Sequence, residues 1–423
     1  MKKTLLSIAL LAASHALSAQ SSYIAIPYND NPWLAGIAMS SNGEYVGGMD
    51  YSMNMFVAKW ADLTVVQPED EPGDMGCCVR CISNTGVGVG FNDNYAVTFD
   101  MTGKTTILDN AEEEGGGAIA EAITADGKFI CGEVGTGKLA KAGYWNEEGK
   151  FVMLPQPTTE ETGLKILGAS ATKVNTDGSL IAGYISDKLS TRPLILWRRG
   201  ADGTYTVDPV FKKYCKDKTS DGLGLMCYFT PTDMSENGKW VAVTVSTDAG
   251  DLKMARYDVE NDKLEVIDYP QIEDGNFCYS SAIANDGTVL GYTSDDESTY
   301  RIALIAKAGE TVAKSFGVEF SGISDLVEFE TLGFNTPCDM TPDGKYIAGY
   351  GMYIDEELDM QVFITYRIDT ENYTASVDRV VAPMADGKTA CFSVNGTRVN
   401  PDTFRGLQIV KGADGKVRKV LKK

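Results

Sequence analysis

The sequence predicts an all-β chain folded as a β-propeller, most simply one with seven blades of four antiparallel strands. Three observations lead to this prediction: a turn phrase that recurs seven times, a short apolar strand after each turn, and no segment with a sustained period of 3.6 residues. The chain has 423 residues, of which 43% are hydrophobic and 23% charged. This composition is that of an ordinary folded protein, and few helices are expected.

The recurring phrase is an apolar residue, usually a small polar residue, one or two spacers, and a turn that ends in glycine. The seven copies are Met39–Gly43, Ile82–Gly86, Ile123–Gly127, Val174–Gly178, Met234–Gly238, Ile283–Gly287 and Met340–Gly344. The glycines lie 41 to 60 residues apart, as in propeller blades with loops of unequal length. Asn-Gly or Asp-Gly ends the turn in six copies. Because both residues tolerate positive φ, each copy is predicted to be a hairpin.

Further strands complete each unit. A second strand closes on small residues, as in Tyr45–Gly48 and Tyr346–Gly349, and predicts close approach of neighbouring backbones. A third strand ends on a large ring such as Trp60, and a short fourth strand follows in most copies. The seven units run from about residue 23 to residue 379. A two-sheet sandwich is the alternative, since regularly spaced hairpins also suit it.

The N-terminus has the pattern of a secretory signal peptide. Met1–Lys3 is basic, Leu5–Ala13 is mostly apolar, and Leu17–Ala19 ends on a small residue, so we expect cleavage after Ala19. The predicted divisions are therefore a signal over 1–19, a propeller over 20–380 and a short β segment over 381–423. No later stretch is apolar enough to predict a transmembrane helix, and the chain is expected to be exported.

Charge and histidine content exclude several functions. Lys and Arg total 38 against 59 Asp and Glu, giving a formal net charge of -21, so nucleic acid is not an expected partner. The single histidine, His15, lies in the predicted signal. The mature chain would then lack the histidine of Ser-His-Asp and Cys-His catalysis, of histidine-ligated zinc and of most haem sites.

The repeat resembles the HAF-type repeats of extracellular proteins and, more loosely, WD-repeat and TolB-like propellers. These families share a Ser-x-Asp-Gly hairpin followed by a strand and a terminal Trp. Met254–Arg256 and Phe56–Ala58 stand where the HAF repeats have His-Ala-Phe. The resemblance implies a propeller that binds a ligand, since most of these families bind rather than catalyse.

The C-terminus carries a second resemblance. Phe392–Val399 and Arg405–Lys411, followed by a basic end, are similar to the terminal segment of exported Bacteroidetes proteins, which in some species the Por (type IX) secretion machinery reads. Gln408 replaces the usual aromatic residue. The resemblance implies a Bacteroidetes protein whose tail is a sorting signal. Alternatively, the segment forms two ordinary hairpin strands that close the fold.

Acidic and aromatic residues on predicted loops are the candidate ligand-binding groups. In a propeller, the loops between second and third strands share one face with the connections between blades, so acidic runs there would form a rim. Clustered carboxylates suit Ca²⁺ or a cationic partner, although no run has the spacing of a calcium loop and solvated surface is the alternative. Tyrosines on the same loops could stack on sugar, or belong to the core. The candidates are Asp295, Asp296, Glu297, Asp355, Glu356, Tyr51, Tyr300 and Tyr353.

Cysteine chemistry offers two candidates. Cys77, Cys78 and Cys81 form a close cluster, but a fourth thiolate or a histidine is missing locally, so no metal is predicted there. Cys215 and Cys227 bracket the long insertion before the fifth hairpin. We predict a disulfide between them, which would stabilise the fold by roughly 3 kcal/mol in the chain-entropy model.

These features predict an exported binding protein on a propeller scaffold, with a protein or a glycan as its ligand and no cofactor other than Ca²⁺. Two alternatives stay open: a carbohydrate-active enzyme that uses paired carboxylates in the central cleft, and a purely structural surface protein. An enzyme predicts two buried carboxylates of raised pKa in a central pocket. A binding protein predicts a contiguous exposed aromatic patch on the loop face.

Overall fold

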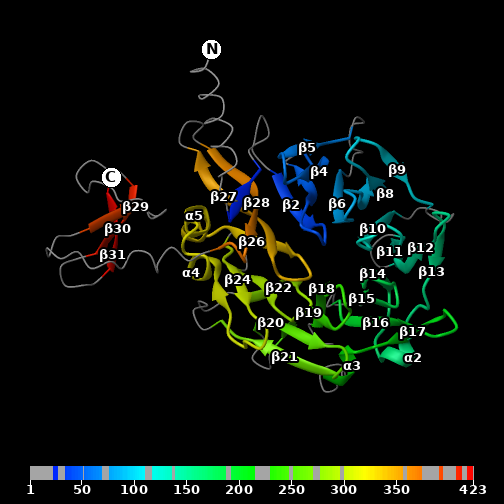
Figure 1. The fold of residues 1–423 in the computed structure, drawn as a ribbon. Helices are drawn as coiled ribbons and strands as arrows, with labels where there is room; N and C mark the ends of the chain where they lie inside the picture. The colour runs from blue at the N-terminus through cyan, green and yellow to red at the C-terminus, as the bar shows by residue number, and fades with distance from the viewer. Residues whose placement is uncertain are drawn as a thin grey trace, which may run out of the picture.

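Seven four-stranded antiparallel sheets are arranged around a common axis, so the predicted seven-bladed β-propeller is confirmed in a computed structural model of the chain (Figure 1). The structure describes residues 22–26, 34–50, 52–68, 76–109, 117–135, 139–186, 192–214, 229–246, 251–269, 277–295, 300–355, 360–373, 390–393, 406–411 and 417–422. The predicted signal peptide lies outside them.

The first four blades each use four consecutive strands, with the first strand innermost. Blade 1 contains β2 (Leu34–Met39), β3 (Tyr45–Asp50), β4 (Met55–Lys59) and β5 (Thr64–Val66). Blade 2 contains β6 (Cys77–Ile82), β7 (Gly88–Asn92), β8 (Tyr95–Phe99) and β9 (Thr105–Ile107). Blade 3 contains β10 (Ala118–Ile123), β11 (Ile130–Val134), β12 (Lys141–Trp145) and β13 (Phe151–Met153). Blade 4 contains β14 (Gly168–Val174), β15 (Leu180–Ser186), β16 (Leu194–Arg199) and β17 (Tyr205–Asp208).

The last blade closes the ring with a strand from the other end of the chain. Blade 5 contains β18 (Phe229–Met234), β19 (Trp240–Ser246), β20 (Leu252–Asp258) and β21 (Lys263–Ile267). Blade 6 contains β22 (Phe277–Ile283), β23 (Val289–Ser294), β24 (Ala303–Ala306) and β25 (Lys314–Ser315). Blade 7 combines β26 (Asn335–Met340), β27 (Tyr346–Asp355) and β28 (Met360–Asp369) with β1 (Tyr23–Ala25), which pairs with β28 at the outer edge. This pairing ties the two ends of the propeller together.

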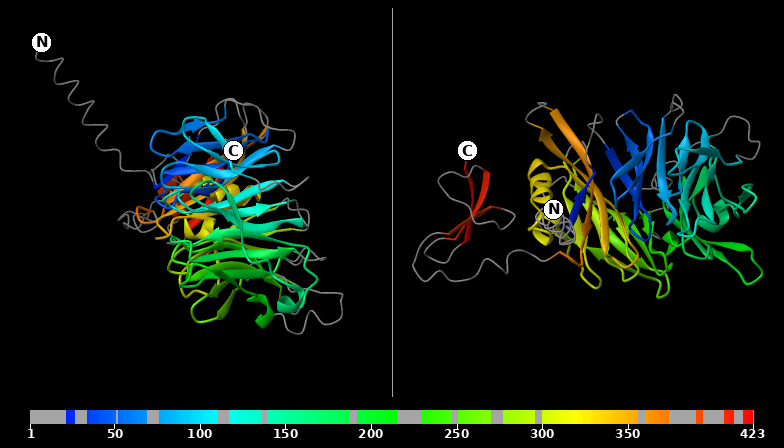
Figure 2. Two further views of the ribbon diagram at one scale, coloured as in Figure 1. Left: turned by 90° about the vertical axis from the view of Figure 1, so that its right-hand side faces the viewer. Right: turned by 45° about the horizontal axis from the view of Figure 1, so that its top comes forward.

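Helices in the described residues are few and short, as the sequence predicts. They are α2 (Thr159–Thr162), α3 (Phe211–Tyr214), α4 (Phe316–Glu319) and α5 (Ser324–Leu332), and α4 and α5 lie between blades 6 and 7 (Figure 2). A separate three-stranded sheet contains β29 (Ala390–Ser393), β30 (Gly406–Lys411) and β31 (Val417–Lys422). Among the helices described, none has the length and apolar character needed to cross a membrane.

The recurring phrase forms the turn between the first and second strand of every blade, and the structure corrects our account of its chemistry. All seven glycines have positive φ, from 68° to 91°, whereas the Asn or Asp that precedes six of them does not. The side chain of Asn42 instead accepts a hydrogen bond from the Glu44 N–H (3.1 Å), and Asp126 accepts one from the Lys128 N–H (3.1 Å). The side chains of Asn and Asp therefore accept hydrogen bonds from backbone N–H groups of the turn, and glycine occupies its left-handed position.

The small polar residue of the phrase bonds across the same turn. The hydroxyl of Ser40 accepts from the Tyr45 N–H (2.9 Å), and those of Ser235 and Thr341 accept equivalent bonds from Trp240 and Tyr346 (both 2.9 Å). Because these hydroxyls lie beside the start of the second strand, each satisfies a partly buried backbone N–H group there. The repeated Ser or Thr is thus explained by backbone hydrogen bonding.

Each innermost strand carries one extra residue, a β-bulge, just before its turn. The register against the second strand shifts at the same place in all seven blades, for example between Gly36 and Ala38 in blade 1. In six blades a glycine of the second strand faces the bulge, and a Cβ there would collide with a carbonyl oxygen of the innermost strand. These glycines are Gly48, Gly90, Gly132, Gly183, Gly291 and Gly349. The predicted close backbone approach is therefore confirmed.

The seam between blades 7 and 1 depends on one threonine. Thr365 donates a hydrogen bond to the carbonyl of Leu34 (2.7 Å) and accepts one from the Gly36 N–H (2.8 Å), and both bonds are buried. Arg367 adds a bond to the carbonyl of Gly43. These contacts join residues more than 300 positions apart in the sequence, at the seam where the ring of blades closes.

Thr365→Val keeps the shape of this side chain and removes both hydrogen bonds. We expect the free energy of unfolding to fall by about 2 to 4 kcal/mol, because a buried N–H and a buried carbonyl lose their partner. Urea denaturation of the two proteins measures this difference. The control is Thr206→Val on the exposed outer strand of blade 4, where little change is expected; equal losses in the two variants would contradict the role given to the seam.

Candidate functional site

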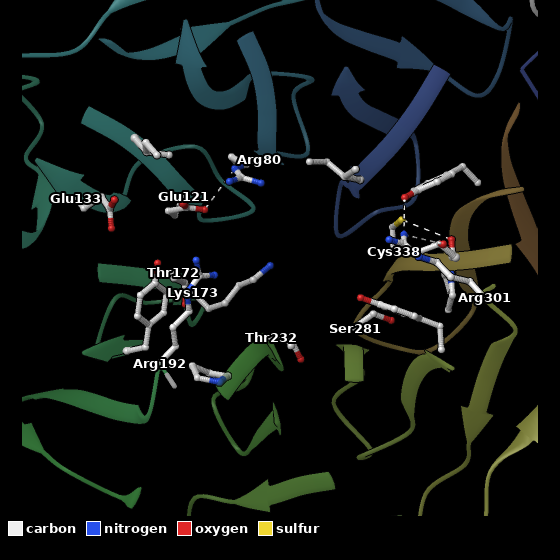
Figure 3. Close-up of a pocket in the computed structure, with 18 of the residues that line it drawn as sticks. Arg80, Glu121, Glu133, Thr172, Lys173, Arg192, Thr232, Ser281, Arg301 and Cys338 are labelled. Carbon is white, nitrogen blue, oxygen red and sulfur yellow. Dashed lines mark hydrogen bonds and ion pairs between the residues drawn. The ribbon is translucent and has the colours of Figure 1, made fainter. Parts of the chain in front are cut away.

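A cavity of about 820 Å³ occupies the centre of the ring, and the bulges determine what lines it. The extra residue of every innermost strand contributes to its wall (Figure 3). The seven residues are Ile37, Arg80, Glu121, Thr172, Thr232, Ser281 and Cys338. Because a bulge re-aims a side chain, each blade presents one variable residue to the same space. We call this cavity the central pocket.

A second set of lining residues comes from the second strands. The residue after the bulge-facing glycine lines the pocket in four blades, as Glu133, Tyr184, Tyr292 and Tyr350. The register places each of them opposite the innermost strand just before the bulge, for example Glu133 opposite Ile119 and Tyr184 opposite Ser170. The repeat therefore places two sets of side chains in the central pocket, one from the bulges of the first strands and one from the second strands.

One wall of the central pocket carries mixed charge. Arg80 and Glu121 are neighbouring bulge residues of blades 2 and 3 and form an ion pair of 3.7 Å, which raises the pKa of Arg80. Glu133 lies in the same wall and is only 7% exposed. Burial, with the nearby Glu121 carboxylate, raises the pKa of Glu133 to about 7. Glu133 therefore exchanges its proton near neutral pH.

Arg192 stands at the edge of this wall, on the loop between β15 and β16. Its guanidinium lies over the Tyr184 ring, 5.2 Å from the ring centre, and its backbone adopts a positive φ of 47°. Burial raises the pKa of Tyr184, and Glu133 adds to this shift. The arginine is exposed, so its charge is available at the mouth of the pocket.

The opposite wall is built around Arg301 (Figure 3). Its backbone bonds to Gly333 and Asn335, and its guanidinium lies between the rings of Tyr292 and Phe334, 5.3 and 5.4 Å from their centres. One terminal nitrogen is 3.3 Å from the Tyr350 hydroxyl. The Nε atom of Arg301 and the nearby Ser281 hydroxyl are buried without a hydrogen-bond partner. This wall therefore has unused capacity to donate hydrogen bonds.

The floor of the pocket is an ion-pair layer one residue further along the innermost strands. Lys173 and Asp233 are 3.3 Å apart. Asp233 also accepts from the Ile283 N–H (2.9 Å), and Asp339 accepts from the Met39 N–H (2.7 Å), so each carboxylate joins its blade to the next. Burial and the neighbouring Asp233 raise the pKa of Asp339. On the turn side of this layer lies a second, smaller cavity of about 80 Å³.

The predicted loop residues lie elsewhere. Asp295 accepts a hydrogen bond from the Tyr300 N–H (3.2 Å), and the Tyr300 ring, 36% exposed, packs against Gly333. Neither lines the central pocket. Tyr353 and Asp355 belong to β27, but their side chains are not among those described. Asp296, Glu297, Glu356 and Tyr51, and with them Cys215 and Cys227, lie outside the described residues.

The described part of the chain offers neither a cluster of metal-ligating side chains nor a reactive thiol at Cys77 or Cys78. No group of three or more His, Cys, Asp or Glu side chains there is placed to hold a metal ion. Cys77 and Cys78 are buried in blade 2, and burial raises the pKa of Cys78 to about 12. A thiol with so high a pKa carries little thiolate, so this cluster belongs to the core.

Sequence reasoning missed the pocket residues, although a signal for them exists. The bulge residue stands two positions before the apolar residue that opens each phrase, and the second set follows the glycine of the second strand. The residues at these positions differ in charge and size, so a search for similar residues does not single them out.

Comparison with known proteins finds similarity to solved structures and none to family models or curated proteins. Among solved structures, the chain is similar to an oligogalacturonate lyase from Vibrio parahaemolyticus, at 12% identity and a TM-score of 0.49, over 83% of this chain and 94% of that chain. It is also similar to a protein assigned as TolB from Agrobacterium tumefaciens, at 10% identity and a TM-score of 0.38, over 67% of this chain and 80% of that one.

The raised pKa of Glu133 predicts a pH dependence of stability. Folding raises this pKa from 4.5 to about 7, so the stabilising contribution is fully present below pH 4.5 and is lost as pH rises through 7. In Glu133→Gln the amide stays neutral, and the loss of stability between about pH 4.5 and pH 8 should shrink by on the order of 1 to 3 kcal/mol. Urea denaturation at both pH values measures it.

Glu148→Gln, on an exposed turn outside the pocket, serves as the control and should keep the pH dependence of the wild-type protein. Asp339 titrates in the same direction, so part of the dependence remains in Glu133→Gln. An unchanged dependence in Glu133→Gln would contradict the assignment.

Proposed function

We propose that this chain is an exported binding protein whose ligand, a glycan, enters the central pocket. The observation that supports this most strongly is the convergence of seven bulge residues, one from each blade, on one cavity. Its volume of about 820 Å³ falls within the range of small-ligand sites. A purely structural protein has no need for polar or charged side chains at five of seven equivalent inward positions.

The chemistry of the lining favours a glycan over a protein ligand. Hydroxyl groups are provided by Thr172, Thr232, Ser281, Thr336 and Tyr350, all of which line the pocket. A polyhydroxylated ligand exchanges hydrogen bonds with such groups, whereas a protein interface is usually anchored by large apolar side chains in apolar pockets. The pocket also offers tyrosine rings, although as separate residues rather than the contiguous exposed patch that the sequence analysis associates with binding.

Thr232→Trp tests the location of the site. The side chain points into the cavity, so a large ring there can fill the pocket without displacing the core, and binding should fall by at least about tenfold. A glycan array with the purified chain identifies the ligand, and titration calorimetry compares the variants. Thr206→Trp places the same ring on the outer strand of blade 4 and should bind as the wild type does. Full binding by Thr232→Trp would place the site elsewhere.

A carbohydrate-active enzyme is the second candidate, because Glu121 and Glu133 share one wall of the pocket and burial raises the pKa of Glu133 to about 7. A carboxyl group of such pKa suits a general acid, and a second carboxylate would be its partner. Product formation from each glycan that binds distinguishes the two functions. Enzymatic turnover that Glu133→Gln abolishes, with binding retained, would favour the enzyme.

A further inference from the structure

The walls of the central pocket carry more cationic than acidic side chains, although the chain is strongly acidic, and the floor beneath them adds the carboxylates of Asp233 and Asp339. The formal net charge of the protein is -21, yet the pocket is lined by four cationic side chains and two carboxylates. The cations are Arg80, Lys173, Arg192 and Arg301. The lining of the central pocket is therefore richer in basic side chains than the chain as a whole.

The cations differ in whether a carboxylate already neutralises them. Arg80 is paired with Glu121, and Lys173 with Asp233. Within the described residues, Arg192 and Arg301 form no ion pair with a carboxylate. A guanidinium without a carboxylate partner in a concave site attracts an anion and can bind a carboxylate with two parallel hydrogen bonds.

The two unpaired guanidinium groups belong to opposite walls of the pocket. Figure 3 shows Arg192 and Arg301 on different sides of the pocket. Arg192 follows the second strand of blade 4, whereas Arg301 is fixed between blades 6 and 7 by its backbone bonds and by the rings of Tyr292 and Phe334. A ligand that reaches both must carry two separated anionic groups. Between them lie hydroxyl groups, including the unpartnered Ser281 hydroxyl.

We propose that the central pocket binds an acidic oligosaccharide and that Arg192 and Arg301 each hold one of its carboxylates. This inference rests on the proposed glycan-binding function and specifies its ligand class. The sugar hydroxyls face the Thr and Ser side chains of the wall, and the Arg301 Nε atom and the Ser281 hydroxyl gain the partners that they lack. An acidic peptide offers the same charge but cannot match the hydroxyl lining.

Titration calorimetry on the full chain tests this with oligomers of glucuronic, mannuronic and galacturonic acid, one to four residues long. The same oligomers with their carboxylates reduced to alcohols are the matched ligands, and a glutamate oligomer represents the peptide. We expect at least one acidic oligosaccharide of two or more residues to bind, its reduced form to bind at least about tenfold more weakly, and binding to weaken as salt is added.

Variants locate the two carboxylate contacts. Arg192→Gln and Arg301→Gln should each weaken binding of the acidic oligomer at least about tenfold, while Arg301→Lys should restore part of it. Arg199→Gln removes an exposed arginine outside the pocket and should bind as the wild type does. Thermal melting of each variant confirms that it is folded. Because Arg192 is on an exposed loop, its variant remains informative even if Arg301→Gln fails to fold.

The outcomes separate this inference from the function on which it rests. If neutral glycans bind and acidic ones do not, the charge assignment is wrong and the glycan-binding function stands. If an acidic oligomer binds equally well to Arg192→Gln and Arg301→Gln, the two contacts are wrong. Tighter binding of the glutamate oligomer would overturn the ligand class. If no acidic or neutral glycan binds, the glycan-binding function fails and the inference fails with it.

Discussion

The bulge in each innermost strand, and the close backbone contact that faces it, is the constraint on which this propeller depends. A regular strand would alternate its side chains between the two faces of the blade, where they pack against neighbouring blades. The extra residue interrupts this alternation and points one side chain per blade at the axis. The opposing strand must then approach so closely that only glycine fits in six blades. Scaffold and site are thus produced by the same irregularity. Six blades have the glycine because the backbones approach so closely there, and the bulge residue differs between blades because its side chain lines the channel.

Contacts between neighbouring blades explain how a ring of similar sheets stays closed. The carboxylates Asp233 and Asp339 each accept a hydrogen bond from the next blade, and on the turn face Asn42 bonds to Asn84 and Asn237 to Asn285. Between blades 7 and 1, Thr365 and Arg367 add further bonds, and β1 completes the last sheet. Apart from Arg367 and the strand β1, these groups are short polar side chains that bond to backbone atoms. They hold the blades in a fixed register without using the channel-facing bulge residues.

The sequence predicted the blades well because the turns obey a local rule. A left-handed backbone position needs glycine, and a buried N–H next to it needs a hydroxyl or a carboxylate, so Gly43 and Ser40 have counterparts in nearly every copy. The site was not predicted, because residues such as Arg80, Glu121 and Thr172 share a position but no chemistry. Their side chains all point at the axis because of the bulge, in which two residues of the first strand lie opposite one residue of the second. A bulge depends on how the two strands pair, so the sequence of one strand alone does not reveal it. Loop carboxylates such as Asp295 were predicted as ligand-binding groups because acidic residues are clustered there in the sequence. In the structure, Asp295 accepts a hydrogen bond from a backbone N–H of its own loop.

The contrast between an acidic chain and a basic pocket has a consequence for ligand size. Salt screens the attraction between the ligand and any single arginine beyond about 8 Å. An anionic ligand outside the pocket is therefore exposed mainly to the negative field of the protein surface. Inside the pocket, Arg192 and Arg301 act at short range, where the attraction is screened much less. Most of the charged groups of a long polyanion would lie next to the acidic protein surface. A short acidic oligomer, or the terminal residues of a longer one, would place its charged groups inside the pocket. For the acidic ligand proposed above, repulsion outside and attraction inside would therefore favour a short oligomer over a long one.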